Sequence, residues 1–187
     1  MRFTELALPG AFLFTPERRE DARGYFARTF CRDEFSAHGL ASDFVQCSTS
    51  FTARRGTLRG LHFQRAPHEE IKLVRCTKGR VLDVLLDLRP DAPTFCRWQA
   101  IELSEENGLV VYIPAGFAHG FQTLADNAEV FYQISERYHP EAAAGVRWND
   151  PAFAIDWPII PPILSERDAG YADFRAETMR PAPTKGP

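Results

Sequence analysis

The feature that most constrains this fold is a succession of short apolar segments between residues 44 and 135, each followed by turn-forming residues. The connecting residues are rich in glycine, proline, asparagine and aspartate, which favour turns through positive φ, a fixed φ or side-chain hydrogen bonds to the backbone. Many short strands at this spacing are typical of an all-β sandwich or barrel. We therefore expect strands at 44–50, 57–64, 70–76, 80–88, 96–103, 109–113, 119–124 and 128–135.

Three further segments refine this interpretation. The apolar run 11–14 is an expected N-terminal strand, and 32–38 is an expected short helix. The segment 81–88 is apolar at both odd and even positions, so it should lie centrally in a sheet that is covered on both faces. Asp83 and Asp87 within it would then face a polar interior or a partner.

The chain is expected to form a single domain over residues 1–175, including an N-terminal arm over residues 1–30. Large apolar residues spaced among prolines after Pro140 indicate an ordered wrap over the sandwich instead of a second domain. Residues 176–187 are rich in proline and small residues, which predicts a flexible tail.

Composition and charge narrow the class of protein. The 187 residues are 44% hydrophobic and 25% charged, which is ordinary for one globular domain. The net charge of −3 argues against a general nucleic-acid binder, because such proteins need a basic surface to neutralise phosphates. Four scattered cysteines without a C-x-x-C pair favour the reducing cytoplasm. We see no signal peptide and no segment near the roughly 20 apolar residues that cross a bilayer, so no membrane association is expected.

Two passages that contain histidine carry the candidate chemistry. In 58–64 the polar side chains of Arg59, His62 and Gln64 lie closer together than a strand that only fills a core would require. In 114–120 the pattern P-x-G-x-x-H ends at His119. This pattern resembles the second motif of the cupin superfamily, small β-barrels in which a Pro-Gly turn leads into a strand whose histidine points into the barrel.

The same passages bear on a metal site. Metal-binding cupins commonly use about three histidines and a glutamate, yet Gln64 stands where an H-x-H pair would have its second histidine. Lys72 would add a positive charge that opposes a dication, and His62 and His119 remain as the obvious ligands. We expect no metal. A metal-dependent cupin, such as a dioxygenase or sugar isomerase, and a non-catalytic sugar-nucleotide binding protein are the alternatives.

Four passages of the chain carry a family resemblance: 56–64, 72–75 with 83–90 after it, 113–121, and 145–151 with 163–168 after it. In this order they resemble the dTDP-4-dehydrorhamnose 3,5-epimerase family. The resemblance extends from about residue 21 to residue 170 and implies a cupin-type jelly-roll sandwich or barrel with a few short peripheral helices. It also implies a nucleotide-diphosphate sugar as substrate, no cofactor, and a homodimer that exchanges the N-terminal arm.

The family inverts carbons beside the ketone of a 4-keto-6-deoxy-hexose by removing a proton and returning it on the opposite face. This chemistry needs a base, a cation or donor at the ketone oxygen and an acid across the ring. The resemblance implies that His62 is the base, Asp168 orients its imidazole, Lys72 is the cation and Tyr132 is the acid. Each also has a structural interpretation: an edge-strand histidine, an acid at a helix N-terminus, a solvated lysine and a core tyrosine.

The resemblance implies a set of substrate-binding residues as well. Arg59 and Arg23 suit the diphosphate, because guanidinium pairs bidentately with phosphate oxygens. Since the arm is exchanged in the family, Arg23 and Phe26 would complete the neighbour's pocket. The full set is Arg23, Phe26, Gln46, Ser48, Arg59, His119, Tyr138 and Arg167.

Four positions depart from the family pattern. Ser48 replaces a common Asn, Arg28 a frequent Glu, Ala143 a frequent Glu and Arg167 the usual Lys. These positions generally contact the nucleotide or the pyrophosphate. The departures leave the reaction type intact, but they leave open which nucleotide is bound and whether one or two centres are inverted.

Strict alternation along a strand would send Arg59 and His62 to opposite faces, because residues three apart have opposite parity. The mechanism needs both side chains in one pocket. A bulge or sharp twist at Gly60 would re-aim one of them, as glycines within strands often do. We therefore predict a break in regular strand pairing at or next to Gly60.

Overall fold

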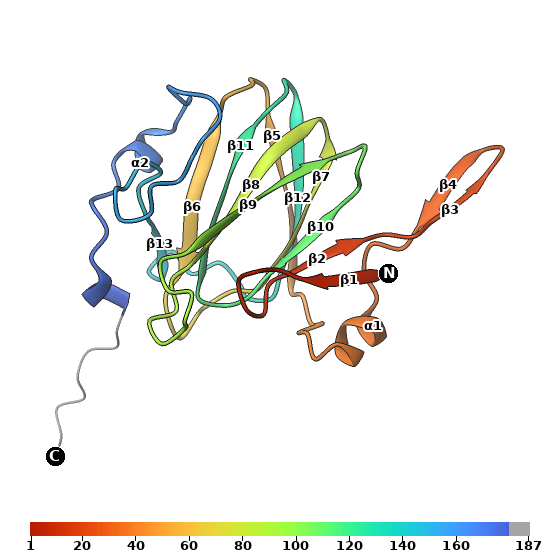
Figure 1. Ribbon diagram of the computed structural model, residues 1–187, viewed down its shortest axis with the longest axis horizontal. Helices are drawn as coiled ribbons and strands as arrows, with labels where there is room; N and C mark the ends of the chain where they lie inside the picture. The colour runs from red at the N-terminus through yellow and green to blue at the C-terminus, as the bar shows by residue number, and fades with distance from the viewer. Residues whose placement is uncertain (180–187) are drawn as a thin grey trace, which may run out of the picture.

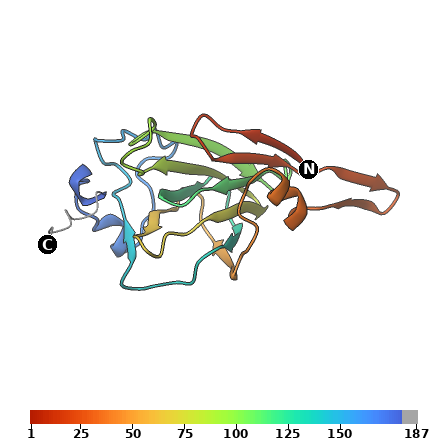
Figure 2. The ribbon, with the colours of Figure 1, turned by 90° about the horizontal axis from the view of Figure 1, so that it is seen from below.

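Residues 1–179, which the computed structural model describes, form a sandwich of two antiparallel sheets (Figures 1 and 2). This confirms the predicted all-β sandwich. In strand order, the first sheet contains β1 (Arg2–Glu5), β2 (Phe12–Thr15), β10 (Val110–Ile113), β7 (Lys72–Lys78), β12 (Ala128–Ile134) and β5 (Gln46–Thr52). The second contains β13 (Ala143–Gly145), β6 (Leu58–Gln64), β11 (Phe117–Thr123), β8 (Arg80–Asp87) and β9 (Trp98–Ser104).

All eight strands expected between residues 44 and 135 are present, and each begins and ends within two residues of its predicted limits. The expected strand at 11–14 corresponds to β2. The sequence pattern did not predict β1, β13 or the hairpin of β3 (Arg18–Asp21) and β4 (Gly24–Ala27). These strands have only three or four residues each, so they are too short to show a periodic pattern.

The strand β8 is covered on both faces, as predicted. Val81 and Leu85 belong to the core between the two sheets. Val84 and Leu86, of the opposite parity, pack under the chain from Ala144 to Trp157, which confirms the predicted wrap. Burial of each such side chain stabilises the fold by roughly 1.5–3 kcal/mol relative to exposure.

Peripheral elements near both ends of the described chain lie outside the two main sheets. The hairpin of β3 and β4 projects from the body (Figures 1 and 2). The predicted helix is α1 (Arg32–Ala37), which buries Phe35 against β1 and β2. Of the predicted flexible tail, Ala176–Met179 forms the 3₁₀ helix η1, and residues 180–187 lie outside the described residues. Within residues 1–179, no helix combines the length and apolar character needed to cross a bilayer.

Regular pairing between β6 and β11 breaks at Gly60, which confirms that prediction. His119 pairs with His62 and Phe121 pairs with Arg59, so β6 has one residue more than β11 between these two pairs. Gly60 has a φ of +131°, and its peptide bond to Leu61 is cis. The two strands approach so closely here that a Cβ at Gly60 would lie 2.5 Å from the Cα of Gly120. The irregularity places Arg59 and His62 on the same cavity.

Gly60→Ala is expected to lower the free energy of unfolding by at least about 3 kcal/mol, through the unfavourable φ and the backbone contact. Gly39→Ala is the matched control, because Gly39 has a φ of +69° with no atom near its Cβ position. It should cost about 1–2 kcal/mol, the backbone contribution alone. Urea denaturation of both variants tests this, and equal costs would contradict the proposed close approach.

The carboxylate of Asp87 ties the end of β8 to the loop that follows it. Arg89 donates Nε and Nη2 hydrogen bonds to Asp87 at 2.9 and 2.7 Å, and the Thr94 hydroxyl donates at 2.6 Å. Burial alone would raise the pKa of Asp87, but the hydrogen bonds from Arg89 and Thr94 and the charge of Arg89 outweigh it and lower the pKa. The folded state therefore favours the ionised form of this buried carboxyl.

Because the folded pKa of Asp87 is depressed, its stabilising contribution is present above the unfolded value of about 3.9 and is lost as the pH falls through the folded pKa. Asp87→Asn should therefore cost about 2–4 kcal/mol at neutral pH and weaken the loss of stability below pH ~4. Chemical denaturation from pH 7 to pH 2 measures both effects. Asp43→Asn removes an exposed ion pair with Arg32 and should change neither the stability at neutral pH nor its loss in acid. If the stability of Asp87→Asn fell with pH in parallel with that of the wild type, Asp87 would not have this role.

Candidate active site

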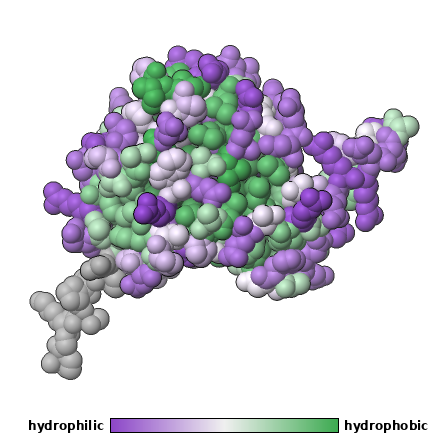
Figure 3. Space-filling view, viewed as in Figure 1, coloured by the Kyte–Doolittle hydropathy of each residue, from purple (hydrophilic) through white to green (hydrophobic). Residues whose placement is uncertain are grey.

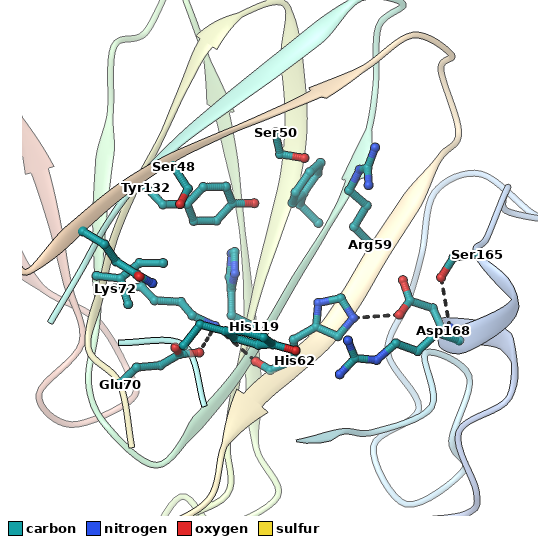
Figure 4. A pocket seen from close by; sticks show the side chains of 15 residues that line it. Ser48, Ser50, Arg59, His62, Glu70, Lys72, His119, Tyr132, Ser165 and Asp168 are labelled. Atoms are coloured by element: carbon teal, nitrogen blue, oxygen red, sulfur yellow. Dashed lines mark hydrogen bonds and ion pairs between the residues drawn. The ribbon is translucent and has the colours of Figure 1, made fainter. Parts of the chain in front are cut away.

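A cavity of about 580 Å³ opens between the two sheets (Figure 4). Its volume is within the range of small-molecule sites. One wall comes from β5, β7 and β12 of the first sheet, and the other comes from β6 and β11 of the second. The short helix α2 (Glu166–Ala169) and its N-cap Ser165 contribute at the side of β6.

His62 and Asp168 form a dyad in this cavity. The Nε2 of His62 lies 2.7 Å from Oδ1 of Asp168, although 106 residues separate them in the chain. The Gly60 N–H donates to the other carboxylate oxygen at 3.3 Å, and the Ser165 hydroxyl accepts from the Asp168 N–H at 3.1 Å. Asp168 is nearly buried, whereas 39% of the His62 side chain is exposed to the cavity side. The carboxylate therefore fixes the ring and leaves its remaining edge accessible.

The hydrogen bonds to Asp168 determine its ionisation. Burial would raise the pKa of this carboxyl, but the hydrogen bond and charge of His62, with further hydrogen bonds from Gly60 and Ser165, lower it. Asp168 is therefore ionised at neutral pH and is placed to stabilise positive charge on the His62 ring.

Tyr132 faces this dyad from the opposite sheet, on β12 (Figure 4). Burial and the negative charge of Asp83 raise its pKa far above the ordinary range, and the smaller effect of Arg59 does not offset them. The hydroxyl therefore keeps its proton. His119 on β11 also lines the cavity. Its Nε2 lies 2.7 Å from Oδ2 of Asp83, and its ring centroid lies 6.0 Å from that of Tyr132.

Lys72 supplies a buried cation to the cavity. Only 9% of its side chain is exposed, so the interpretation as a solvated lysine is wrong. Its ammonium lies 2.9 Å from the Glu70 carboxylate and donates to the His62 carbonyl at 3.3 Å. These contacts hold the charge close to the His62 backbone, on the inner side of the cavity.

The structure gathers all four predicted catalytic residues in this cavity, together with Gln46, Ser48, Arg59, His119, Tyr138 and Arg167. Within the described chain, the lining includes neither Arg23 nor Phe26, which lie on the projecting hairpin. Arg28 also lies apart and pairs with Glu34. Within the described chain, these three residues therefore do not contribute to the cavity.

Sequence reasoning did not identify the other lining residues. Alternation along β5 from Gln46 and Ser48 could have found Ser50, and the spacing from Lys72 could have found Glu70. The same alternation could have found Phe121 from His119 and Ile134 from Tyr132, whereas Ser165 owes its position to the packing of α2 beside β6. The unanticipated residues are Ser50, Glu70, Phe121, Ile134 and Ser165.

Two histidines of the cavity, His62 and His119, are potential metal ligands. His62 and His119 both direct Nε2 at a carboxylate, and Lys72 places an ammonium nearby. Among residues 1–179, the group of three or more His, Cys, Asp or Glu with ligand atoms within 4.8 Å of one another lies elsewhere, in the loops that carry His68 and His139. The cavity residues therefore do not form a three-ligand set of the cupin type.

Comparison with known proteins identifies the family of this fold and site. The family model for dTDP-4-dehydrorhamnose 3,5-epimerase matches residues 5–176. The chain belongs to this family. It is 44% identical over 177 residues to the dTDP-4-dehydrorhamnose 3,5-epimerase of Methanothermobacter thermautotrophicus. The aligned segment covers 93% of this chain and 95% of that relative.

Two crystal structures show how similar the fold of this epimerase family member is to its relatives. The epimerase of Bacillus anthracis, solved with TDP and pyrophosphate bound, has a TM-score of 0.90 and 38% identity, covering 92% of this chain and 99% of the other. The epimerase of Legionella pneumophila, in complex with dTDP-4-keto-L-rhamnose, has a TM-score of 0.86 and 35% identity, covering 91% and 90%. Of the interpretations considered from sequence, the epimerase is the one that these findings support.

Proposed function

We propose that the cavity inverts C3 and C5 of a dTDP-linked 4-keto-6-deoxy-hexose, and that His62, Tyr132, Lys72 and Asp168 carry out the reaction. One observation carries the assignment of roles. The imidazole of His62 and the hydroxyl of Tyr132 enter the same cavity from opposite sheets. A sugar ring between them would present one face to a base and the other to an acid, which is the arrangement that inversion requires.

The proposed reaction begins with neutral His62. Its free ring edge accepts the proton from a carbon beside the C4 ketone, and the electrons of the broken C–H bond form a C=C bond as the ketone oxygen becomes an enolate. Lys72 stabilises that oxygen, and the Asp168 carboxylate stabilises the imidazolium. Tyr132 then donates its hydroxyl proton to the opposite face of the carbon, and exchange with solvent restores both residues.

The polar residues at the rim suit the nucleotide end of the substrate. Arg59 is held by the Thr52 hydroxyl at 2.9 Å and the Phe51 carbonyl at 3.2 Å, which leaves donors of its guanidinium for a diphosphate. Arg167 donates to the Tyr171 hydroxyl at 3.0 Å beside the exposed ring of Tyr138. We assign Arg59 and Arg167 to the diphosphate and Tyr138 to stacking on the base.

The proposed activity is tested by incubation with dTDP-4-keto-6-deoxy-glucose in deuterated water, with NMR of the product. We expect one deuterium at each inverted carbon and conversion to the epimer at both C3 and C5. Deuterium at C3 alone would indicate a single inverted centre. The CDP-linked sugar, assayed in parallel, shows whether Ser48 and Arg167 leave the nucleotide preference for thymidine intact; the absence of exchange with either sugar would reject the function.

We further propose a homodimer in the cytoplasm in which each arm completes the site of the partner. The hairpin stands away from the body (Figure 3) and exposes 56% of Tyr25 and 67% of Phe26. An isolated two-stranded hairpin is marginally stable in water, so these aromatic residues favour a protein surface as their contact. All four cysteines are free thiols, which suits a reducing compartment.

Mixing inactive subunits tests the dimer. Arg23→Ala and His62→Asn should each reduce turnover as homodimers, but a hybrid dimer has one site with both native residues. Random exchange between equal amounts should therefore restore about a quarter of wild-type turnover, since half the dimers are hybrids with one intact site. Light scattering should give twice the chain mass. A monomer, or a mixture with no regained turnover, would reject the exchanged arm.

A further inference from the structure

Two loops outside the cavity bring together a cluster of metal-ligating side chains. His68 comes from the loop before β7, and Glu136 and His139 come from the loop between β12 and β13. Their ligand atoms all lie within 4.8 Å of one another, and Nε2 of His139 is 3.6 Å from a Glu136 carboxylate oxygen. All three are partly exposed, so an ion could reach them directly from solvent.

A buried glutamine holds the two loops in place. Gln64 at the end of β6 is only 4% exposed. Its amide nitrogen donates to the carbonyls of His68 and Arg137, both at 3.0 Å, and its amide oxygen accepts from the His139 N–H at 2.6 Å. The backbones of both histidines are therefore positioned by one side chain, which lowers the conformational entropy lost when their rings bind a ligand together.

His139 also has the outer partner that a metal-bound histidine usually has. Its Nδ1 lies 3.2 Å from a carboxylate oxygen of Glu141, while Nε2 is directed toward Glu136. In metal sites the second ring nitrogen commonly donates to a carboxylate, which selects the tautomer and makes the ligating nitrogen more basic. This arrangement is independent of the distances among His68, Glu136 and His139 and points to the same use of His139.

We propose that His68, Glu136 and His139 bind one divalent transition-metal ion, with Zn²⁺ as the best-suited ion, and that Glu141 positions His139. Two imidazoles and a carboxylate are a common zinc donor set, with water in the remaining position. The ring centroids of His68 and His139 lie 3.6 Å apart and their planes differ by 14°, so their lone pairs lie in nearly parallel planes. Binding therefore turns one ring until both nitrogens point at the ion.

The ion would link the two loops that border the mouth of the cavity. Tyr138 directly precedes His139, and Glu70 follows His68 by two residues; both line the cavity. Metal binding at this site does not involve His62, Lys72 or Tyr132 of the cavity. Its primary effect is to stabilise the loop that carries Tyr138, and it does not depend on the proposed epimerisation.

The test uses the untagged full chain, stripped with a chelator and titrated with Zn²⁺ by calorimetry and with Co²⁺ by visible absorption. We expect one ion per chain and an increase in the unfolding temperature with added Zn²⁺. His139→Ala and His68→Ala should abolish binding, and Glu141→Gln should weaken it about 10- to 100-fold, the usual effect of removing an outer partner. Glu136→Gln, at a partly exposed position, provides a ligand variant that the fold should tolerate.

Two controls separate this site from other histidines. His38→Ala removes a surface histidine that stacks on Phe3, and His62→Asn removes the cavity histidine; both should bind Zn²⁺ like the wild type. A cooperative unfolding transition, measured in the presence of chelator, shows that each variant is folded without metal. Absence of Zn²⁺ binding by the wild type, or unchanged binding by both His139→Ala and Glu136→Gln, would overturn the proposal. Loss of binding in His62→Asn would relocate the ion to the cavity and overturn it as well.

Discussion

His62→Asn is expected to lower kcat for epimerisation by about 10²- to 10⁴-fold, the usual contribution of a positioned base. Asparagine is close in size to histidine and can still form a hydrogen bond to Asp168, so the cavity should keep its shape. It cannot accept a proton from carbon. Solvent deuterium incorporation beside the ketone should therefore stop together with product formation, which NMR in deuterated water measures directly.

Asp168→Asn distinguishes positioning from proton transfer. The base remains, but the ionised carboxylate that orients the ring and stabilises its positive charge is lost. We expect slower exchange than in the wild type, because the ring loses the group that orients it and the imidazolium that forms loses its counter-charge. His38→Asn is the control, as His38 lies beside α1, and it should behave like the wild type. Wild-type exchange by His62→Asn would show that another group is the base.

Tyr132→Phe should retain exchange with solvent from the His62 side but reduce formation of the inverted product by about 10²- to 10³-fold. The physical reason is the raised pKa of Tyr132, which keeps its proton in place until the enolate forms on the other side of the cavity. Phenylalanine preserves the ring that packs against the core between the sheets. The fold should therefore persist while the proton donor is lost.

Tyr112→Phe is the matched control for this prediction. Tyr112 lies on β10 of the same sheet, is buried, and accepts a hydrogen bond from the Ala41 N–H at 3.2 Å. It is absent from the cavity lining of the described chain, so its loss should leave turnover and stereochemistry unchanged. NMR of the products separates exchange from inversion. Full inversion by Tyr132→Phe would assign the acid to a different group.

The strand pattern was predictable because it is local. Alternation and turn residues specify strands such as β6 and β8 within short windows, so their limits follow from nearby side chains. The hairpin β3–β4 could not be predicted in this way, because all but one of its strand residues are exposed and the pattern has no buried side. The same applies to β13, whose three residues form a strand because β6 offers an edge for pairing.

The same distinction between local and tertiary features applies to the active site. The amino-acid sequence by itself determined the order of the strands, the two histidine-containing passages, the break at Gly60 and, through family resemblance, the residues to examine. Tertiary structure decided that Asp168 reaches His62, that Lys72 is buried beside Glu70, and that the arm lies away from its own cavity. The physical reason is that strand parity specifies the face on which a side chain lies, whereas the packing of distant strands and loops determines which faces meet.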